Sequence, residues 1–204
     1  MKRVGPKPAA LSLNSIVDEA VRLLGDEGLE GVSLRRLAAR LGVRAPSLYW
    51  HVPDKSTLLA AMMERIFRAC VESVPSRTHW REWMQEFGAA LWRTQDATRD
   101  FAPLLITSPM DDAQITRVEA LLTERLVRLD IPVEDALRIQ SSVQVLMTGW
   151  FIFAHTQFSP ALSLRMDFHA RALQDLELLL EGEARRLSQP RPLRRVRRRS
   201  RSAG

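Results

Sequence analysis

Cysteine and long apolar runs are nearly absent from this 204-residue chain. The one cysteine, Cys70, excludes an internal disulfide framework and is typical of a protein kept in a reducing cytoplasm. The longest apolar run, residues 143–154, is shorter than the roughly 20 residues that a membrane-spanning helix needs. The first residues are basic but lack the apolar core of a signal peptide. We therefore expect a cytoplasmic protein without a membrane partner.

The motifs of common catalytic sites are missing as well. The sequence has no glycine-rich phosphate-binding loop, no His/Cys/Glu group at metal-ligand spacing and no nucleophile signature. His155 and His169 stand alone, and a lone histidine is more often a structural residue than a ligand. These absences argue against an enzyme, a cofactor and a metal site.

The net charge of +6 is distributed unevenly along the chain. Residues 1–74 carry a formal charge of +3, residues 75–188 carry −4, and residues 189–204 carry +7 from seven arginines and no acid. A basic head on an acidic body suits a protein that holds DNA at one end. The arginine-rich end is too poor in apolar residues to form a core, so we expect it to be disordered. It either adds sequence-independent affinity for DNA or has no role.

Apolar residues recur at helical spacing through most of the chain, and no useful stretch alternates as a strand does. The sequence therefore predicts an all-α fold of about nine helices.

Residues 33–55 form the most informative stretch, SLRRLAARLGVRAPSLYWHVPDK. Ser33 is a suitable N-cap, Gly42 suits the left-handed residue that ends a helix, and Pro46 suits the start of the next helix. Pro53 then ends that second helix. Two short helices joined by a tight turn form the unit that places its second helix in the DNA major groove. Such helix pairs also occur as ordinary packing in all-α proteins.

Three segments, IVDEAVRLL, GLEGVSLRRLAARLGV and PSLYWHVPDKSTLL, carry a resemblance to a known family. They make residues 12–63 similar to the DNA-binding domain of the tetracycline-repressor (TetR) family of transcriptional regulators. The LYWHV string looks closest to the branch of the tetracycline repressor itself. The resemblance covers the N-terminal third of the chain and implies an N-terminal helix-turn-helix domain followed by a helical ligand-binding and dimerisation domain.

The resemblance also implies roles for individual residues. Arg35 looks like the family's guanine-reading arginine, and Pro46 and Ser47 lie where the recognition helix meets base edges. Ala45 suits a thymine methyl but departs from the longer polar side chain of the tetracycline repressor, so the operator should differ. We add Arg44 on physical grounds, from its place at the mouth of the helix. The residues expected to contact phosphates are Ser33, Tyr49, Trp50, His51 and Lys55.

Dimerisation is expected because one helix pair covers only a few base pairs, so tight binding generally needs two heads on a two-fold symmetric operator. The apolar segment 143–154 and the amphipathic helix expected over residues 164–187 are the natural dimer surface. The resemblance implies the same arrangement, a four-helix interface built from the last two helices. Alternatively, both helices belong to the core of one subunit.

Large apolar side chains also gather around a short segment, residues 101–106, that is bounded and interrupted by prolines. As a set they suit a cavity for an apolar aromatic molecule, although any single member is more often core than pocket. The resemblance implies the same site, with the ligand shifting the short helix and then the fourth helix. A metal–tetracycline chelate is a poor fit, because apolar residues stand where that repressor has polar and histidine side chains. The candidate ligand-binding residues are Trp83, Phe87, Leu91, Phe101, Leu104, Leu105, Met147, Trp150 and Phe151.

Together these features predict a repressor that binds a palindromic DNA operator as a homodimer and is released by a small apolar or aromatic effector. We expect a flexible basic arm over residues 1–11, the helix-turn-helix domain over residues 12–62, the ligand-binding and dimerisation domain over residues 63–188 and the arginine-rich tail over residues 189–204. Two alternatives stay open: an architectural DNA-binding protein without small-molecule input, and a regulator whose body binds a partner protein.

Overall fold

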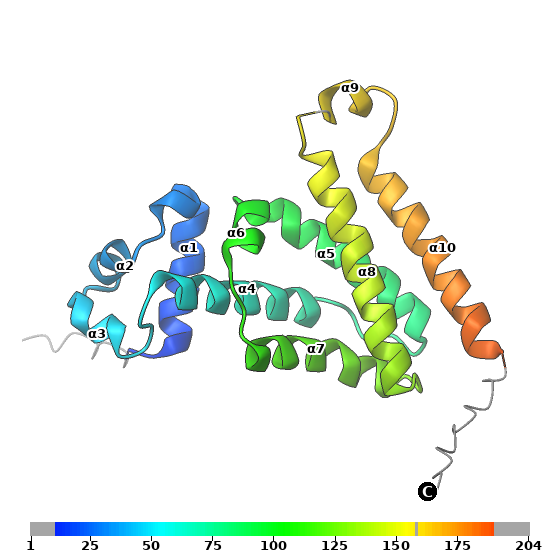
Figure 1. Ribbon diagram of the computed structural model, residues 1–204, viewed down its shortest axis with the longest axis horizontal. Coiled ribbons are helices and arrows are strands. Elements are labelled where there is room, and N and C mark those ends of the chain that lie inside the picture. Colours follow the sequence, from blue (N-terminus) through cyan, green and yellow to red (C-terminus); the bar gives the residue numbers. More distant parts are fainter. Residues whose placement is uncertain (1–10, 158, 190–204) are drawn as a thin grey trace, which may run out of the picture.

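The computed structural model describes residues 11–157 and 159–189, and this part of the chain contains ten α-helices and no strand (Figure 1). The all-α prediction is confirmed. The helices exceed the expected nine because a one-turn helix forms between the last two long ones. The expected basic arm, except for Leu11, and the arginine-rich tail beyond Gln189 lie outside the described residues. In chain order the helices are α1 (Leu13–Gly31), α2 (Leu34–Leu41), α3 (Ala45–Tyr49), α4 (Lys55–Glu72), α5 (Trp80–Ala97), α6 (Phe101–Thr107), α7 (Asp112–Val127), α8 (Val133–Ala154), α9 (Ser159–Ser163) and α10 (Phe168–Ser188).

The head of the molecule consists of α1, α2 and α3 packed on the first turns of α4 (Figure 1). A capping box between Ser12 and Ser15 starts α1. The sequence places the end of this helix near Glu27, but α1 continues to Gly31 across a break at Gly28, whose φ of 76° lies in the left-handed region that favours glycine. The fully buried side chains in the interior of the head include Ile16, Leu23, Leu37, Leu48, Val52 and Leu58.

The body is a helical bundle in which α5, α8 and α10 pack side by side, while α7 packs on α4 and α8 (Figure 1). Trp83 and Phe87 of α5 stack with ring centroids 5.9 Å apart, and both are buried. Burial of large aromatic side chains contributes most per residue to such a core. These two residues therefore hold the centre of the body together.

Helix α8 is apolar on two faces, as the sequence indicates for residues 143–154. Val143, Met147 and Phe151 face the core and are buried. Val145 is 73% exposed and Phe153 is also exposed, so the residues that the structure describes leave the second apolar face of α8 uncovered. No described helix combines the length and the apolar content that crossing a membrane requires.

We expect Phe87→Ala to lower the free energy of unfolding by about 3–5 kcal/mol, because it removes a buried ring and leaves a cavity. Urea denaturation at a fixed protein concentration measures this change. The control is Ile106→Ala, where the side chain is 79% exposed and the change should stay within about 0.5 kcal/mol. A loss as small as that of the control would contradict the central position of Phe87.

Candidate nucleic-acid interface and cavity

The turn between α2 and α3 forms through the residues that the sequence indicates. The Ser33 hydroxyl accepts a hydrogen bond from the Arg36 N–H at the start of α2. Gly42 ends the helix in the left-handed region, with φ of 67°. Pro46 lies in the first turn of α3, at its second position rather than its first. Leu48 is the buried residue of α3 and fixes this helix against the head, and Pro46, Ser47 and Tyr49 of the same helix are left exposed.

The arginines of this region fall into two groups. Arg40 donates to Glu19 at 2.6 Å and to Asp26 at 2.7 Å, and Arg36 pairs with Glu27, so both are turned back onto α1. Arg35 and Arg44 are exposed and make no hydrogen bond or ion pair through their side chains to any other described residue.

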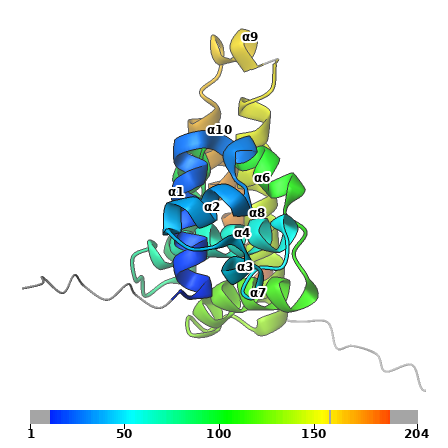
Figure 2. The same cartoon turned by 90° about the vertical axis from the view of Figure 1, so that its left-hand side faces the viewer.

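The other predicted DNA contacts lie on the same part of the molecule, the head end onto which Figure 2 looks. Trp50 is 90% exposed, which excludes a role in the core of a single subunit. Pro46, Ser47, Tyr49, His51 and Lys55 are exposed as well, whereas Ser33 and Ala45 are half-buried. Lys55 reaches the Leu29 carbonyl at 3.5 Å, a long contact that leaves its ammonium accessible. All ten predicted residues thus lie on α2, on α3, at the start of α4 or in the turns that directly flank these helices.

Helix α4 and the turn between α5 and α6 both join this head to the body. Helix α4 begins in the head, where the Asp54 carboxylate accepts from the Thr57 N–H, and ends in the body. The hydrogen bonds from the Thr57 N–H and the Ser56 hydroxyl lower the pKa of Asp54, because they stabilise its charged form. The second connection is the turn between α5 and α6.

In that turn, the Asp100 carboxylate accepts a hydrogen bond from the Leu29 N–H at 2.8 Å. Arg99 donates to the Asp26 carbonyl at 2.8 Å. Both bonds fall beside the break in α1 at Gly28, where a side chain would meet Asp100: a Cβ there would lie 2.7 Å from its Oδ2 atom. We name Arg99 and Asp100 with these bonds the head–body link.

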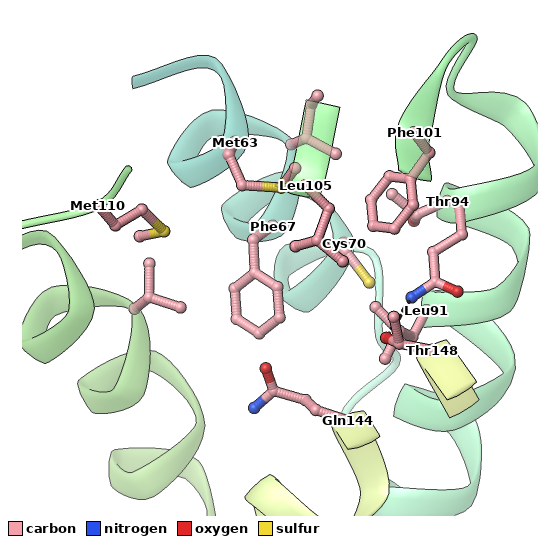
Figure 3. A pocket seen from close by; sticks show the side chains of 13 residues that line it. Met63, Phe67, Cys70, Leu91, Thr94, Phe101, Leu105, Met110, Gln144 and Thr148 are labelled. Carbon is pink, nitrogen blue, oxygen red and sulfur yellow. Dashed lines mark hydrogen bonds between the residues drawn. The ribbon is translucent and has the colours of Figure 1, made fainter. Parts of the chain in front are cut away.

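A cavity of about 130 Å³ lies among α4, α5, α6, α7 and α8 (Figure 3). Figure 3 shows Phe67 of α4 near the middle, Phe101 and Leu105 of α6 above it, and Gln144 of α8 below it. The thirteen residues that line it are Met63, Ile66, Phe67, Cys70, Leu91, Thr94, Gln95, Phe101, Leu105, Met110, Val118, Gln144 and Thr148.

Three of the nine predicted ligand-binding residues, Leu91, Phe101 and Leu105, line this cavity. Of the others, Trp83, Phe87, Leu104, Met147 and Phe151 are buried in the core, and Trp150 lies between α8 and α10, where its Nε1 donates to Asp175 at 3.1 Å. Sequence reasoning missed the wall that α4 supplies and the polar residues of α5 and α8. A signal was present, because Thr94, Gln95, Gln144 and Thr148 interrupt otherwise apolar helix faces.

Among the described residues that line the cavity, none has an ionised side chain. The titratable group among them is Cys70, whose pKa is raised because burial disfavours the thiolate. Just outside, Arg117 of α7 holds Glu64 of α4 through two bonds of 3.1 and 3.0 Å and lowers the pKa of that carboxyl group. No three His, Cys, Asp or Glu side chains of the described residues meet in a way that could hold a metal ion.

Comparison with known proteins agrees with this geometry. The model of the tetR family of bacterial regulatory proteins matches residues 16–62. The tetracycline repressor protein class E of Escherichia coli is 35% identical over 143 residues, which cover 69% of this chain and 67% of that protein. The class D repressor of Escherichia coli is 33% identical over 116 residues, or 56% of this chain and 53% of that protein.

The same overall fold is found among solved structures. A TetR transcriptional regulator of Streptomyces coelicolor superimposes with a TM-score of 0.68 and 22% identity, covering 88% of this chain and all (100%) of that one. At this identity the likeness shows the fold alone. With the family match on the head and the alignment across two thirds of the class E repressor, this chain belongs to the tetR family of bacterial regulatory proteins.

Proposed function

We propose that the protein is a DNA-binding repressor whose homodimer binds a palindromic operator and leaves it when a small apolar or aromatic molecule fills the cavity. The observation that carries this proposal is the division of the arginines in the head: Arg36 and Arg40 are neutralised by α1, whereas Arg35 and Arg44 stay exposed and unpaired within the described residues. In this proposal residues 12–62 are the DNA-binding domain and residues 63–188 the ligand-binding and dimerisation domain.

Arg35 is proposed to read a guanine, because a guanidinium fork matches the O6 and N7 acceptors of that base. Ala45, Pro46 and Ser47 present small side chains that allow the backbone of α3 to approach base edges. The proposed phosphate contacts, which fix the register of the head on the duplex, are Ser33, Arg44, Tyr49, Trp50, His51 and Lys55.

The proposed dimer interface is the uncovered face of α8 together with α10. These helices run beside each other at the end of the molecule opposite to α2 and α3 (Figure 1). Val145 and Phe153 of α8 and Leu178 of α10 are large, apolar and exposed, and Gly149 between the first two leaves room for a close approach. An apolar face of this kind marks a protein–protein contact, and a two-fold axis there would pair two heads on one operator.

Coupling between the cavity and DNA is proposed to use both connections to the head. Phe101 lines the cavity directly after Asp100, the residue that holds the Leu29 N–H. Met63 and Phe67 line it from α4, whose first turns pack in the head. A molecule that displaces α6 or α4 would therefore change the angle of the head relative to the body.

We expect Arg35→Ala to weaken operator binding by the dimer about thirtyfold or more, because each of the two heads loses a bidentate arginine–guanine pair worth ~1–3 kcal/mol. An operator is first selected from random DNA by the purified protein and read by sequencing, and affinity is then measured by fluorescence anisotropy. Arg36→Ala is the control and should change affinity less, since Arg36 faces Glu27. Equal losses in the two variants, or recovery of unenriched DNA by the wild type, would contradict sequence reading by Arg35.

Val145→Glu should convert the dimer to a monomer, because it places a charge on the proposed interface without a partner. Light scattering coupled to size exclusion would then report about the 23.2 kDa of one chain. Val127→Glu changes an exposed residue of α7, away from this face, and should leave the dimer intact. A dimeric Val145→Glu protein would place the interface elsewhere.

Asp100→Ala should speed hydrogen exchange at the Leu29 amide about tenfold to a hundredfold, because a hydrogen bond to a charged acceptor is worth ~1.5–3 kcal/mol. Asp130→Ala is a matched control: Asp100 and Asp130 both have a positive φ, 54° and 63°, so alanine is strained equally at both, and Asp130 lies in the α7–α8 turn. Exchange measured amide by amide tests this. The same rate at Leu29 in both variants would show that the head–body link does not hold α1.

A further inference from the structure

The side chains that line the cavity restrict the charge of what can bind there. The thirteen described residues of the wall include no acid, lysine, arginine or histidine, and the raised pKa of Cys70 keeps its thiol neutral. An ion placed against such a wall loses its hydration and gains no counter-charge. The cavity therefore favours a neutral molecule.

One residue of the wall, Gln144 of α8, has an amide group without a partner. Gln144 is half-buried, and its side chain forms no hydrogen bond with any other described residue. The polar side-chain atoms of the described residues that are both fully buried and unpartnered belong to Arg81, Gln95, Arg138 and Gln140. The oxygen and the nitrogen of the Gln144 amide are not among these atoms, so both are accessible to a molecule of the size of water.

The direction of this side chain places the amide in the cavity. Figure 3 shows Gln144 extending from α8 into the space below Phe67 of α4. Two other polar residues of the wall, Gln95 and Thr148, are bonded to each other, with the Gln95 Nε2 2.7 Å from the Thr148 Oγ1. The Gln144 amide is therefore the one of the two lining amides that both its atoms leave open to a ligand.

A glutamine amide carries a donor and an acceptor side by side in one plane. A ligand with one polar atom satisfies only one of them, and the other is left unpaired once the ligand has displaced water, which is unfavourable. A second amide offers the complementary pair: its N–H donates to the Gln144 Oε1, and its carbonyl oxygen accepts from the Gln144 Nε2. The two bonds are parallel and form whichever way the Gln144 amide is turned about its last side-chain bond.

The size of the cavity sets a scale for the rest of the ligand. Its volume is about 130 Å³, and an apolar protein cavity of ~150 Å³ holds a benzene molecule. Leu105, which lines the cavity from α6, is 37% exposed, so the wall is not closed on that side. One ring that carries a carboxamide group is therefore of suitable size.

We infer that the effector of the proposed repressor is a neutral molecule with one apolar ring and a carboxamide or lactam group that pairs with the Gln144 amide through two hydrogen bonds. This inference rests on the proposed function in naming the molecule an effector, whereas the binding preference follows from the cavity itself. Gln144 provides the selectivity, because a ring of the same shape without the paired groups leaves its donor, its acceptor or both unsatisfied.

The test compares benzamide, acetophenone and benzoate by titration calorimetry. The three molecules have the same shape: acetophenone has a methyl group in place of the NH₂ group of benzamide, and benzoate has a charged oxygen there. The wild-type protein should bind benzamide about fivefold or more tightly than acetophenone, which cannot donate to Oε1. Benzoate should bind at least about tenfold more weakly than benzamide, because its charge finds no counter-charge. Acetophenone is more hydrophobic than benzamide, so the expected order is opposite to the one that transfer from water alone would produce.

Gln144→Met keeps the length of the side chain and removes its amide, so the variant should bind acetophenone more tightly than benzamide. Gln140→Met is the matched control: Gln140 is an amide one turn away on the same helix, contacts Thr123 at 3.4 Å and does not line the cavity. It should keep the wild-type preference. Circular dichroism and melting temperature confirm that each variant is folded, and the three-ligand comparison on the wild type needs no variant.

Several outcomes would overturn the inference: acetophenone or benzoate binding as tightly as benzamide, no binding of any of the three, an unchanged preference in Gln144→Met, or the same loss of preference in both variants. Operator binding measured in parallel separates the inference from the proposed function. A preference for benzamide that depends on Gln144, without release of the operator, supports the binding chemistry and refutes the cavity as the site of regulation. Release of the operator by benzamide from the wild type and not from Gln144→Met supports both.

Discussion

The structure depends above all on α4, which is buried both in the head and beside the cavity. The first turns of α4 place Leu58 and Leu59 in the interior of the head, and its later turns place Met63, Ile66 and Phe67 against the cavity. Eighteen residues form this helix, which makes it about 27 Å long. Because protein interiors are close-packed, a change at one end of such a helix is not absorbed locally. The head and the cavity are consequently parts of one packed unit.

The charge of the head depends on α1 as well as on α2 and α3. The acids of α1 hold Arg36 and Arg40 through several ion pairs, and these pairs also tie α2 to α1. Arg36 and Arg40 thus help to position the helix pair, whereas Arg35 and Arg44 have no partner among the described residues. The head–body link adds Asp100 to the same end of α1. The orientation of α2 and α3 is thus determined by polar contacts on one side and by Leu48 on the other.

Local patterns in the sequence predicted the head well, because its signals are local. Ser33, Gly42 and Pro46 act through neighbouring backbone groups, so their roles follow from spacing alone. The cavity was predicted less well, because a helical face shows which residues are buried and not which helix covers them. Gln95 and Thr148 meet across 53 positions of sequence. The extension of α1 beyond Gly28 likewise depends on a distant residue, Asp100.

The ion pairs of Arg36 and Arg40 have a consequence for how DNA binding depends on salt. Each phosphate that a cation neutralises releases counterions from the duplex, and the number released sets how steeply affinity falls with salt. Arg36 and Arg40 are already neutralised by acids of their own subunit. These two arginines should therefore release few counterions from the duplex when the complex forms. The described part of the head should therefore bind DNA with a shallower salt dependence than its arginine content suggests.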